Sequence, residues 1–134
     1  MSEQALCHKT AELTVPAHPD FARCVRMFAA NIAGVMKMDV EQLEDIRLAA
    51  QEAFVMTLSL VKADEVTVSA QIDDEALTLD FHLTHAAKRV DALQEDESHM
   101  YAILILEATC DEIDLAQTNQ NAIRIKKHRE GRDA

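Results

Sequence analysis

The chain has 134 residues, of which 49% are hydrophobic and 4% aromatic, and its 24 acidic and 13 basic side chains give a formal charge of −11. This length and hydrophobic content predict one domain with a real core and exclude a disordered tail. The negative charge repels phosphate backbones and argues against a nucleic-acid partner. It suits a protein partner with a basic surface, or it serves solubility alone.

The three cysteines, Cys7, Cys24 and Cys110, lie far apart and form no Cys-x-x-Cys pair. Their odd number and spacing predict neither a disulfide framework nor a thiolate zinc site, and indicate reduced thiols in a cytoplasmic protein. We expect Cys24 and Cys110 in the core. The N-terminal segment is too polar for a signal peptide, and no apolar run approaches the about 20 residues of a membrane span.

The first predicted elements are an edge strand at 12–15 and a helix that starts near Pro19 and Asp20, a residue pair that favours a helix N-terminus. Apolar residues then recur at helical spacing, namely Phe21, Cys24, Val25, Phe28, Ile32, Val35 and Met36. Asp39 and Gln42 resemble a capping box, which predicts a second helix that continues past Leu58.

After Asp64 the period of the apolar residues changes from helical to alternating. The alternation over 66–72 and 77–83, with acidic residues between them, predicts a hairpin. Residues 84–98 are charged and weakly patterned, which indicates a mobile connection or a short helix. Residues 99–110 are apolar nearly all round and predict a helix that is buried on most sides. Two strands around 118–121 complete the pattern.

This order of elements predicts an α/β (α+β) fold, a two-layer sandwich in which three helices cover one face of a mixed, mostly antiparallel sheet. The sheet should comprise residues 12–15, 65–83 and 112–127. A single domain should span 1–134, with a core at about 12–127 and tails at 1–11 and 128–134. The other face of the sheet is then either a dimer or partner surface, or simply a polar face.

Three segments, TVPAHPDFARCVRMF, VEQLEDIRLAAQEAF and LEATCDEIDL, resemble the anti-sigma factor serine/threonine kinases of bacterial partner-switching systems. The resemblance covers about 12–127. This family belongs to the GHKL superfamily, which also contains histidine-kinase catalytic domains and gyrase B. The resemblance implies a Bergerat-type ATP-binding fold and a cytoplasmic regulator of transcription that binds a sigma factor or its antagonist. It also implies that the protein can form a homodimer.

The nucleotide-binding motifs of that family are degenerate in this chain. In the family, an Asn on the second helix holds Mg²⁺, an Asp after the third strand reads adenine, and glycines surround the phosphates. The residues at these positions are Met56, Leu83, His85, Met100 and Ala102. A phosphate site needs bare backbone amides, and Mg²⁺ needs oxygen ligands. The sequence therefore predicts no nucleotide, cofactor or metal site, and predicts that Phe54, Met56, Leu83 and Met100 pack into the space.

The catalytic base of the family is retained as Glu52. If the pocket has collapsed, Glu52 is a structural group at its rim. The alternative is a divergent serine/threonine kinase that still binds ATP and uses Glu52 as base. A third interpretation is a subunit that dimerises with a competent paralogue and tunes it. A metal site at His82 and His85 is not predicted, because residues three apart on a strand point to opposite faces.

Arg26 lies where the family carries an arginine that meets both the sigma factor and its antagonist. It is therefore the predicted partner-binding residue, since arginine often anchors protein interfaces; a solvated surface arginine is the other interpretation. The sequence as a whole predicts a non-catalytic, anti-sigma-factor-like protein that holds a sigma factor or an anti-anti-sigma antagonist. The first helix and residues 84–98 are its predicted contact surfaces.

Overall fold

The computed structural model describes residues 9–84, 88–89, 97–115 and 121–129. In chain order the elements are β1 (Lys9–Pro16), a short 3-10 helix (Pro19–Phe21), α1 (Ala22–Val35), α2 (Val40–Leu60), β2 (Val61–Lys62), β3 (Glu65–Ile72), β4 (Ala76–Thr84), β5 (Lys88–Arg89), α3 (Glu97–Thr109), β6 (Glu112–Asp114) and β7 (Asn121–His128). Residues 9–11 and 128, which the sequence assigned to tails, belong to β1 and β7.

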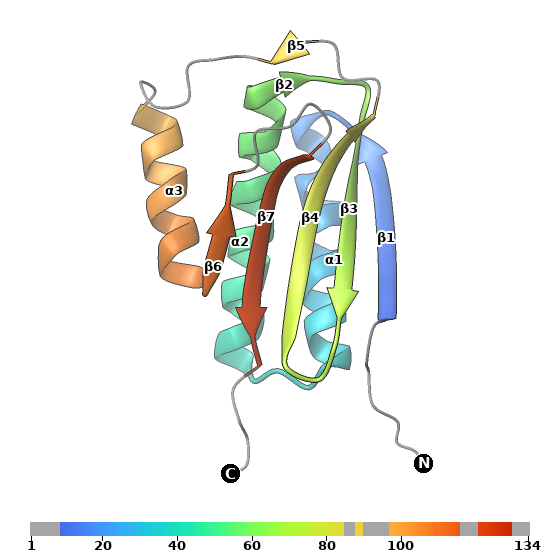
Figure 1. Cartoon of the computed structure of the whole chain (residues 1–134), viewed down its shortest axis with the longest axis vertical. Helices are drawn as coiled ribbons and strands as arrows, with labels where there is room; N and C mark the ends of the chain where they lie inside the picture. Colours follow the sequence, from blue (N-terminus) through green and yellow to red (C-terminus); the bar gives the residue numbers. More distant parts are fainter. Residues whose placement is uncertain (1–8, 85–87, 90–96, 116–120, 130–134) are drawn as a thin grey trace.

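Five strands form one layer in the order β1-β3-β4-β7-β6, and every pairing in this sheet is antiparallel. The helices α1 and α2 cover one face of the sheet, and α3 packs against α2 and β6 at the edge of the helix layer (Figure 1). β2 and β5 form a separate two-stranded sheet. The predicted two-layer sandwich is therefore confirmed, but its sheet is antiparallel throughout and not mixed.

The β3–β4 hairpin follows from the alternating pattern. One side of each strand is buried against the helices, with Val66, Val68, Ala70 and Ile72 opposite Leu83, Phe81, Leu79 and Leu77. Asp73 closes the turn, because its Oδ1 accepts hydrogen bonds from the backbone N–H groups of Glu75 (2.7 Å) and Ala76 (2.9 Å). The alternation and the turn chemistry together fix the register.

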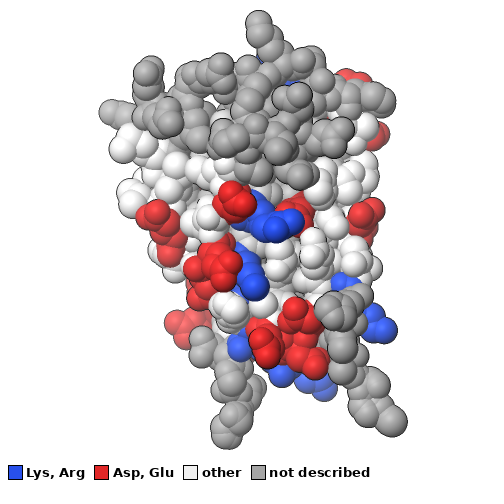
Figure 2. All heavy atoms as spheres, viewed as in Figure 1, with Lys and Arg blue, Asp and Glu red and all other residues white. Residues whose placement is uncertain are grey.

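The outward side of the five strands, here called the sheet face, is polar. Thr10, Glu12 and Thr14 of β1 lie on it, followed by alternate residues of the neighbouring strands. Figure 2 shows carboxylates and cations intermixed over this side of the molecule. The sheet therefore buries one face only, as antiparallel sheets commonly do.

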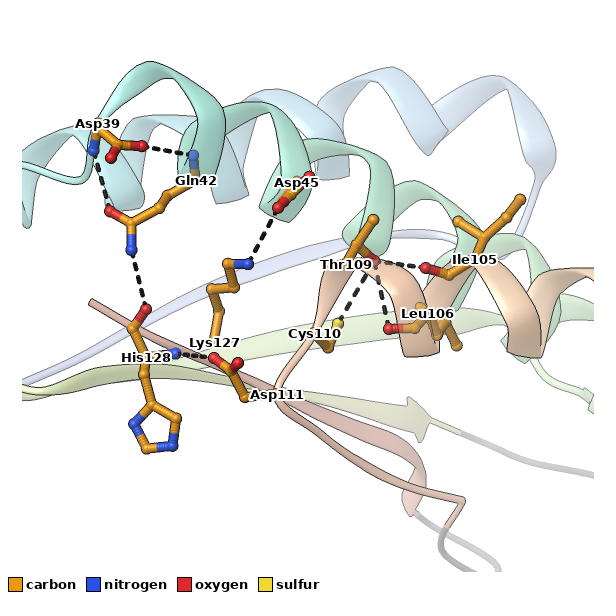
Figure 3. A network of polar contacts seen from close by, with 10 residues as sticks. All are labelled: Asp39, Gln42, Asp45, Ile105, Leu106, Thr109, Cys110, Asp111, Lys127 and His128. Carbon is orange, nitrogen blue, oxygen red and sulfur yellow. Dashed lines mark hydrogen bonds and ion pairs between the residues drawn. The ribbon is translucent and has the colours of Figure 1, made fainter. Parts of the chain in front are cut away.

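The start of α2 is fixed by the predicted capping box. The Asp39 Oδ1 accepts from the Gln42 backbone N–H at 2.8 Å, and the Gln42 Oε1 accepts from the Asp39 N–H at 3.1 Å. Gln42 is buried, and its Nε2 also donates to the carbonyl of His128 at the end of β7 (Figure 3). One turn further along α2, Asp45 accepts from Lys127 at 3.1 Å. These contacts join the two layers at one end of the molecule.

Most of the stripe predicted for α1 meets the core. Val25 and Met36 are buried, and Phe21, Phe28 and Ile32 are partly buried against the core, whereas Val35 is exposed. Cys24 is exposed too, so the expectation that it lies in the core is wrong. Ala29 and Ala33 are also buried, and a search for large apolar residues at helical spacing does not find them because their side chains are small.

The helix α3 is also less buried than predicted. Among its described side chains, only Ala102, Leu106 and Thr109 are buried, while Met100, Tyr101 and Leu104 are 55%, 67% and 62% exposed. The helix lies at the edge of its layer and packs mainly on α2, so its opposite side faces solvent (Figure 1). The expectation that it is buried on most sides is wrong.

Candidate partner-binding surface

Two of the residues that the resemblance matches to nucleotide ligands lie in the core. Met56 is 2% exposed and Leu83 is 6% exposed. Phe54 is buried in the same hydrophobic core. Met100 does not join them, because it lies on the solvent side of α3; this part of the prediction is wrong. His85 lies outside the described residues.

Glu52 is half-buried on α2, four residues after Leu48 and three before Val55, which are both exposed. Residues at these spacings share one row on a helix. Met56, by contrast, belongs to the buried side of α2. Glu52 therefore borders the outer surface, and no described residue forms an ion pair or hydrogen bond with its carboxylate.

Arg26 is half-buried where α1 meets α2. Its Nη1 donates to the Oε1 of Gln51 at 2.6 Å, so the side chain joins the two helices. The neighbouring Met27 is exposed. A guanidinium has further N–H donors beyond the one that Gln51 accepts, and these can meet a carboxylate or carbonyl of another protein. Arg26 is thus positioned by its own fold at the outer surface of the helix layer.

The large hydrophobic side chains that are exposed within the described residues all lie on helices: Met27, Val35, Val40, Leu48, Val55, Met100, Tyr101 and Leu104. Six of them lie on α2 and α3, namely Val40, Leu48, Val55, Met100, Tyr101 and Leu104. Exposed apolar side chains of this size are candidates for contact with another protein.

The sheet face is built differently, around the carboxylate of Asp80. This side chain is only 6% exposed. Its Oδ1 accepts from the Arg124 Nε at 2.5 Å and its Oδ2 from the Gln71 Nε2 at 2.7 Å. The Asp80 carboxylate raises the pKa of Arg124, chiefly through its hydrogen bond and then through its charge. Across the edge strand, Asp114 lies opposite Arg124.

Two shallow hollows lie on the sheet face, with volumes of about 450 Å³ and 260 Å³. The larger one is lined by three acidic side chains, Asp73, Glu112 and Asp114, and by two basic ones, Arg124 and Lys126. Charges of both signs so close together give the hollow no strong field of one sign with which to select an ion. Of the two alternatives that the sequence left open for this face, the arrangement favours the polar sheet face.

The remaining candidate residues give no second site. Within the described residues, no group of three or more His, Cys, Asp or Glu side chains could hold a metal ion. Burial raises the pKa of the Cys110 thiol to about 11, which disfavours the reactive thiolate. No helix in the described part of the chain is long and apolar enough to cross a membrane. Cys7 and most of the 84–98 connection lie outside the described residues.

No protein-family model matches the chain, and a search of curated proteins finds no match either. The resemblance to the anti-sigma factor kinases therefore rests on the three sequence segments quoted above, and it remains a prediction.

Sequence reasoning missed two features of these surfaces. The exposed side of α3 carries no signal of its own, because Met100–Leu106 is almost uniformly apolar and a uniform segment has no polar side to mark solvent. Asp80 could have been found, since it lies between Leu79 and Phe81 in an alternating strand and marks the outward positions as polar.

Proposed function

We propose that the protein is a non-catalytic, anti-sigma-factor-like regulator that works in the cytoplasm by holding a sigma factor or an anti-anti-sigma antagonist. The proposal rests on the burial of two residues that the resemblance matches to nucleotide ligands. Met56 and Leu83, where a kinase of this family would bind Mg²⁺ and adenine, are core side chains. Apolar side chains are meanwhile exposed on the helices.

The position of Arg26 supports a partner surface on α1. Its side chain is held by Gln51 and is therefore partly ordered before any partner arrives. An arginine that is ordered in advance loses less side-chain entropy on binding. Beside it, the exposed Met27 supplies apolar area of the adaptable kind that protein-binding surfaces use.

The first test is calorimetric titration of the purified protein with Mg-ATP and with Mg-ADP. The proposal expects no heat of binding, because the ligand positions are filled by packed side chains. A saturable heat with micromolar affinity would overturn it and favour the divergent kinase with Glu52 as base.

The second test measures binding to the sigma factors and small antagonists encoded by the same genome, each purified and titrated separately. Arg26→Ala should weaken the complex about thirtyfold, the effect of losing an anchoring interface arginine. Arg23→Ala, a change at an exposed arginine one turn away on α1, is the control and should leave affinity unchanged. Gln51→Ala separates the two roles of Arg26, because it breaks the contact between the helices and keeps the guanidinium.

A further inference from the structure

The helix α3 is apolar on almost every side but is buried on only one. Its buried side chains are Ala102, Leu106 and Thr109, which recur four and three residues apart. The helix stands at the edge of the helix layer and packs on α2 and β6 (Figure 1). A helix that is apolar all round is normally covered all round. Within the described residues, the fold leaves the other side of α3 uncovered.

The outward side chains of α3 form one row. Tyr101, Leu104 and Ala108 follow one another at spacings of three and four residues, and all three are exposed. Met100 and Glu107 are also exposed and lie four residues before and three residues after Leu104. With about 100° between successive residues, these five positions occupy about one third of the helix circumference. We call them the α3 face.

The sequence around the α3 face supplies negative charge only. Residues 90–123 contain eight aspartates and glutamates and no lysine or arginine, and one of these acids lies on the α3 face itself. The cations that follow in β7 are engaged elsewhere. Arg124 and Lys126 line the larger hollow on the sheet face, and Lys127 pairs with Asp45 of α2 at 3.1 Å. A partner that covers the α3 face therefore meets an apolar row in a negative field.

We propose that the α3 face binds a helix of a partner protein that carries an apolar row flanked by lysine or arginine. This proposal deepens the proposed function and rests on it, since it assumes that the chain holds another protein. Apolar positions that alternate three and four residues apart are what two helices need to pack along their length. Basic residues beside the partner's row would meet Glu107 and the negative field around it.

The charge distribution argues against other occupants of the α3 face. A second copy docked through the same face would bring two segments without cations together, in a chain whose formal charge is already −11. Anionic lipid headgroups and nucleic-acid phosphates would meet the same repulsion. A basic amphipathic helix combines apolar contact with charge attraction.

The probe is a synthetic amphipathic helix with leucine along one face and lysine on both flanks, labelled for fluorescence anisotropy. The intact chain should bind it in preference to a matched peptide that has glutamate in place of lysine. Tyr101→Ser/Leu104→Ser should weaken binding about tenfold or more, because it removes apolar area at the centre of the α3 face. The control pair Val35→Ser/Val40→Ser changes two similarly exposed residues on the other helices and should have no effect.

A second pair of variants tests the charge. Glu107→Lys should weaken binding about fivefold or more, because it places a cation beside the lysines of the probe. Glu12→Lys makes the same change of charge at an exposed position of the sheet face and should have a smaller effect. Equal effects of the two variants would mean that the peptide senses net charge alone, which would overturn the proposal. If the serine pair fails to fold, Leu104→Lys gives the same measurement with one change.

The remaining outcomes separate this proposal from the proposed function. Unchanged peptide affinity in the α3 variants would overturn the docking site, even if a sigma factor still bound through Arg26. A dimer in sedimentation equilibrium that Tyr101→Ser/Leu104→Ser dissociates would assign the α3 face to a second copy and overturn the proposal as well. Binding of Mg-ATP would overturn the proposed function and leave the location of the docking site untouched.

Discussion

The two outer surfaces of the molecule differ in the kind of side chain that they expose to water. The sheet face carries charges that pair with one another, and even its most buried carboxylate, Asp80, has Arg124 and Gln71 as partners. The outer side of the helices carries exposed apolar side chains instead, such as Tyr101 and Leu104. On the sheet face, Asp80 and its partners therefore need no group from another molecule.

This difference teaches where a partner should be sought. A charge that already has a partner gains little from a second one, whereas an exposed apolar side chain gains from any surface that removes it from water. The helices are therefore the side on which binding yields free energy. The following variants test the contrast and the core that separates the two surfaces.

The largest loss of stability is expected from Met56→Asn, which introduces the amide that the kinases resembled by this chain carry at the matching position. An amide at this buried site replaces a well-packed side chain and loses its hydration, so the free energy of unfolding should fall by about 3 kcal/mol. Met27→Asn, at an exposed methionine, is the control. Urea denaturation measures both variants. If Met56→Asn kept the stability of the parent and bound Mg-ATP, the space would be a ligand site.

The next effect is a difference in thiol reactivity between Cys24, which is exposed on α1, and Cys110, which lies between α3 and β6. At pH 8 in a Cys7→Ser background, exposed Cys24 should react with a thiol reagent about a hundredfold faster than Cys110, whose pKa is about 11. The Cys110 thiol has a higher pKa in the folded state than in the unfolded chain. The free energy of unfolding should therefore fall as the pH rises from the usual pKa of a cysteine thiol towards 11. Cys110→Ser should abolish that thiol's part of the decline, and equal labelling rates would contradict the burial of Cys110.

Asp80→Ala tests the pairing on the sheet face. It removes the acceptor of Arg124 and Gln71 and should lower the free energy of unfolding by about 2 kcal/mol, measured by thermal denaturation. Asp114→Ala, at an exposed carboxylate on the edge strand, should change it far less. A double-mutant cycle with Arg124→Ala isolates the pair. If Asp80→Ala is as stable as the parent, the sheet face does not depend on this network.

A smaller loss is expected for the contact between α1 and α2. Arg26→Ala and Gln51→Ala should each lower the free energy of unfolding by about 1 kcal/mol, because both break the same hydrogen bond. Since the two residues share one interaction, the double variant should lose less than the sum of the single ones. Strict additivity would mean that the bond contributes nothing to stability.

The smallest effect on stability belongs to the exposed side of α3. Tyr101→Ser/Leu104→Ser should change the free energy of unfolding by no more than about 0.5 kcal/mol per site, because both side chains are already largely in water. Leu106→Ser, two residues further along the same helix and fully buried, should be far more damaging. A loss for the exposed pair that approaches the loss for Leu106→Ser would show that Tyr101 and Leu104 are covered within the chain itself.

The predictable part of the fold depends on contacts between residues close in sequence. The alternation of β3 and β4, the turn at Asp73 and the capping box of Asp39 and Gln42 are all set by neighbours within a few positions. Such patterns can be read without knowing what lies across the core. The expectation that Met56 and Leu83 pack inward came from the resemblance to a known family and not from a local pattern, and the structure gives both as core residues.

The side on which each helix is buried depended on neighbours that are distant in sequence. The alanines of α1 face inward because α2 lies close to them, and α3 leaves Tyr101 and Leu104 in water because only one helix flanks it. Gln42 and Lys127 occupy inward positions because each finds a polar partner on the opposite layer. Sequence by itself determined which segments are helices and strands, since that depends on local periodicity; tertiary packing alone decided which of the apolar side chains on the helices remain exposed.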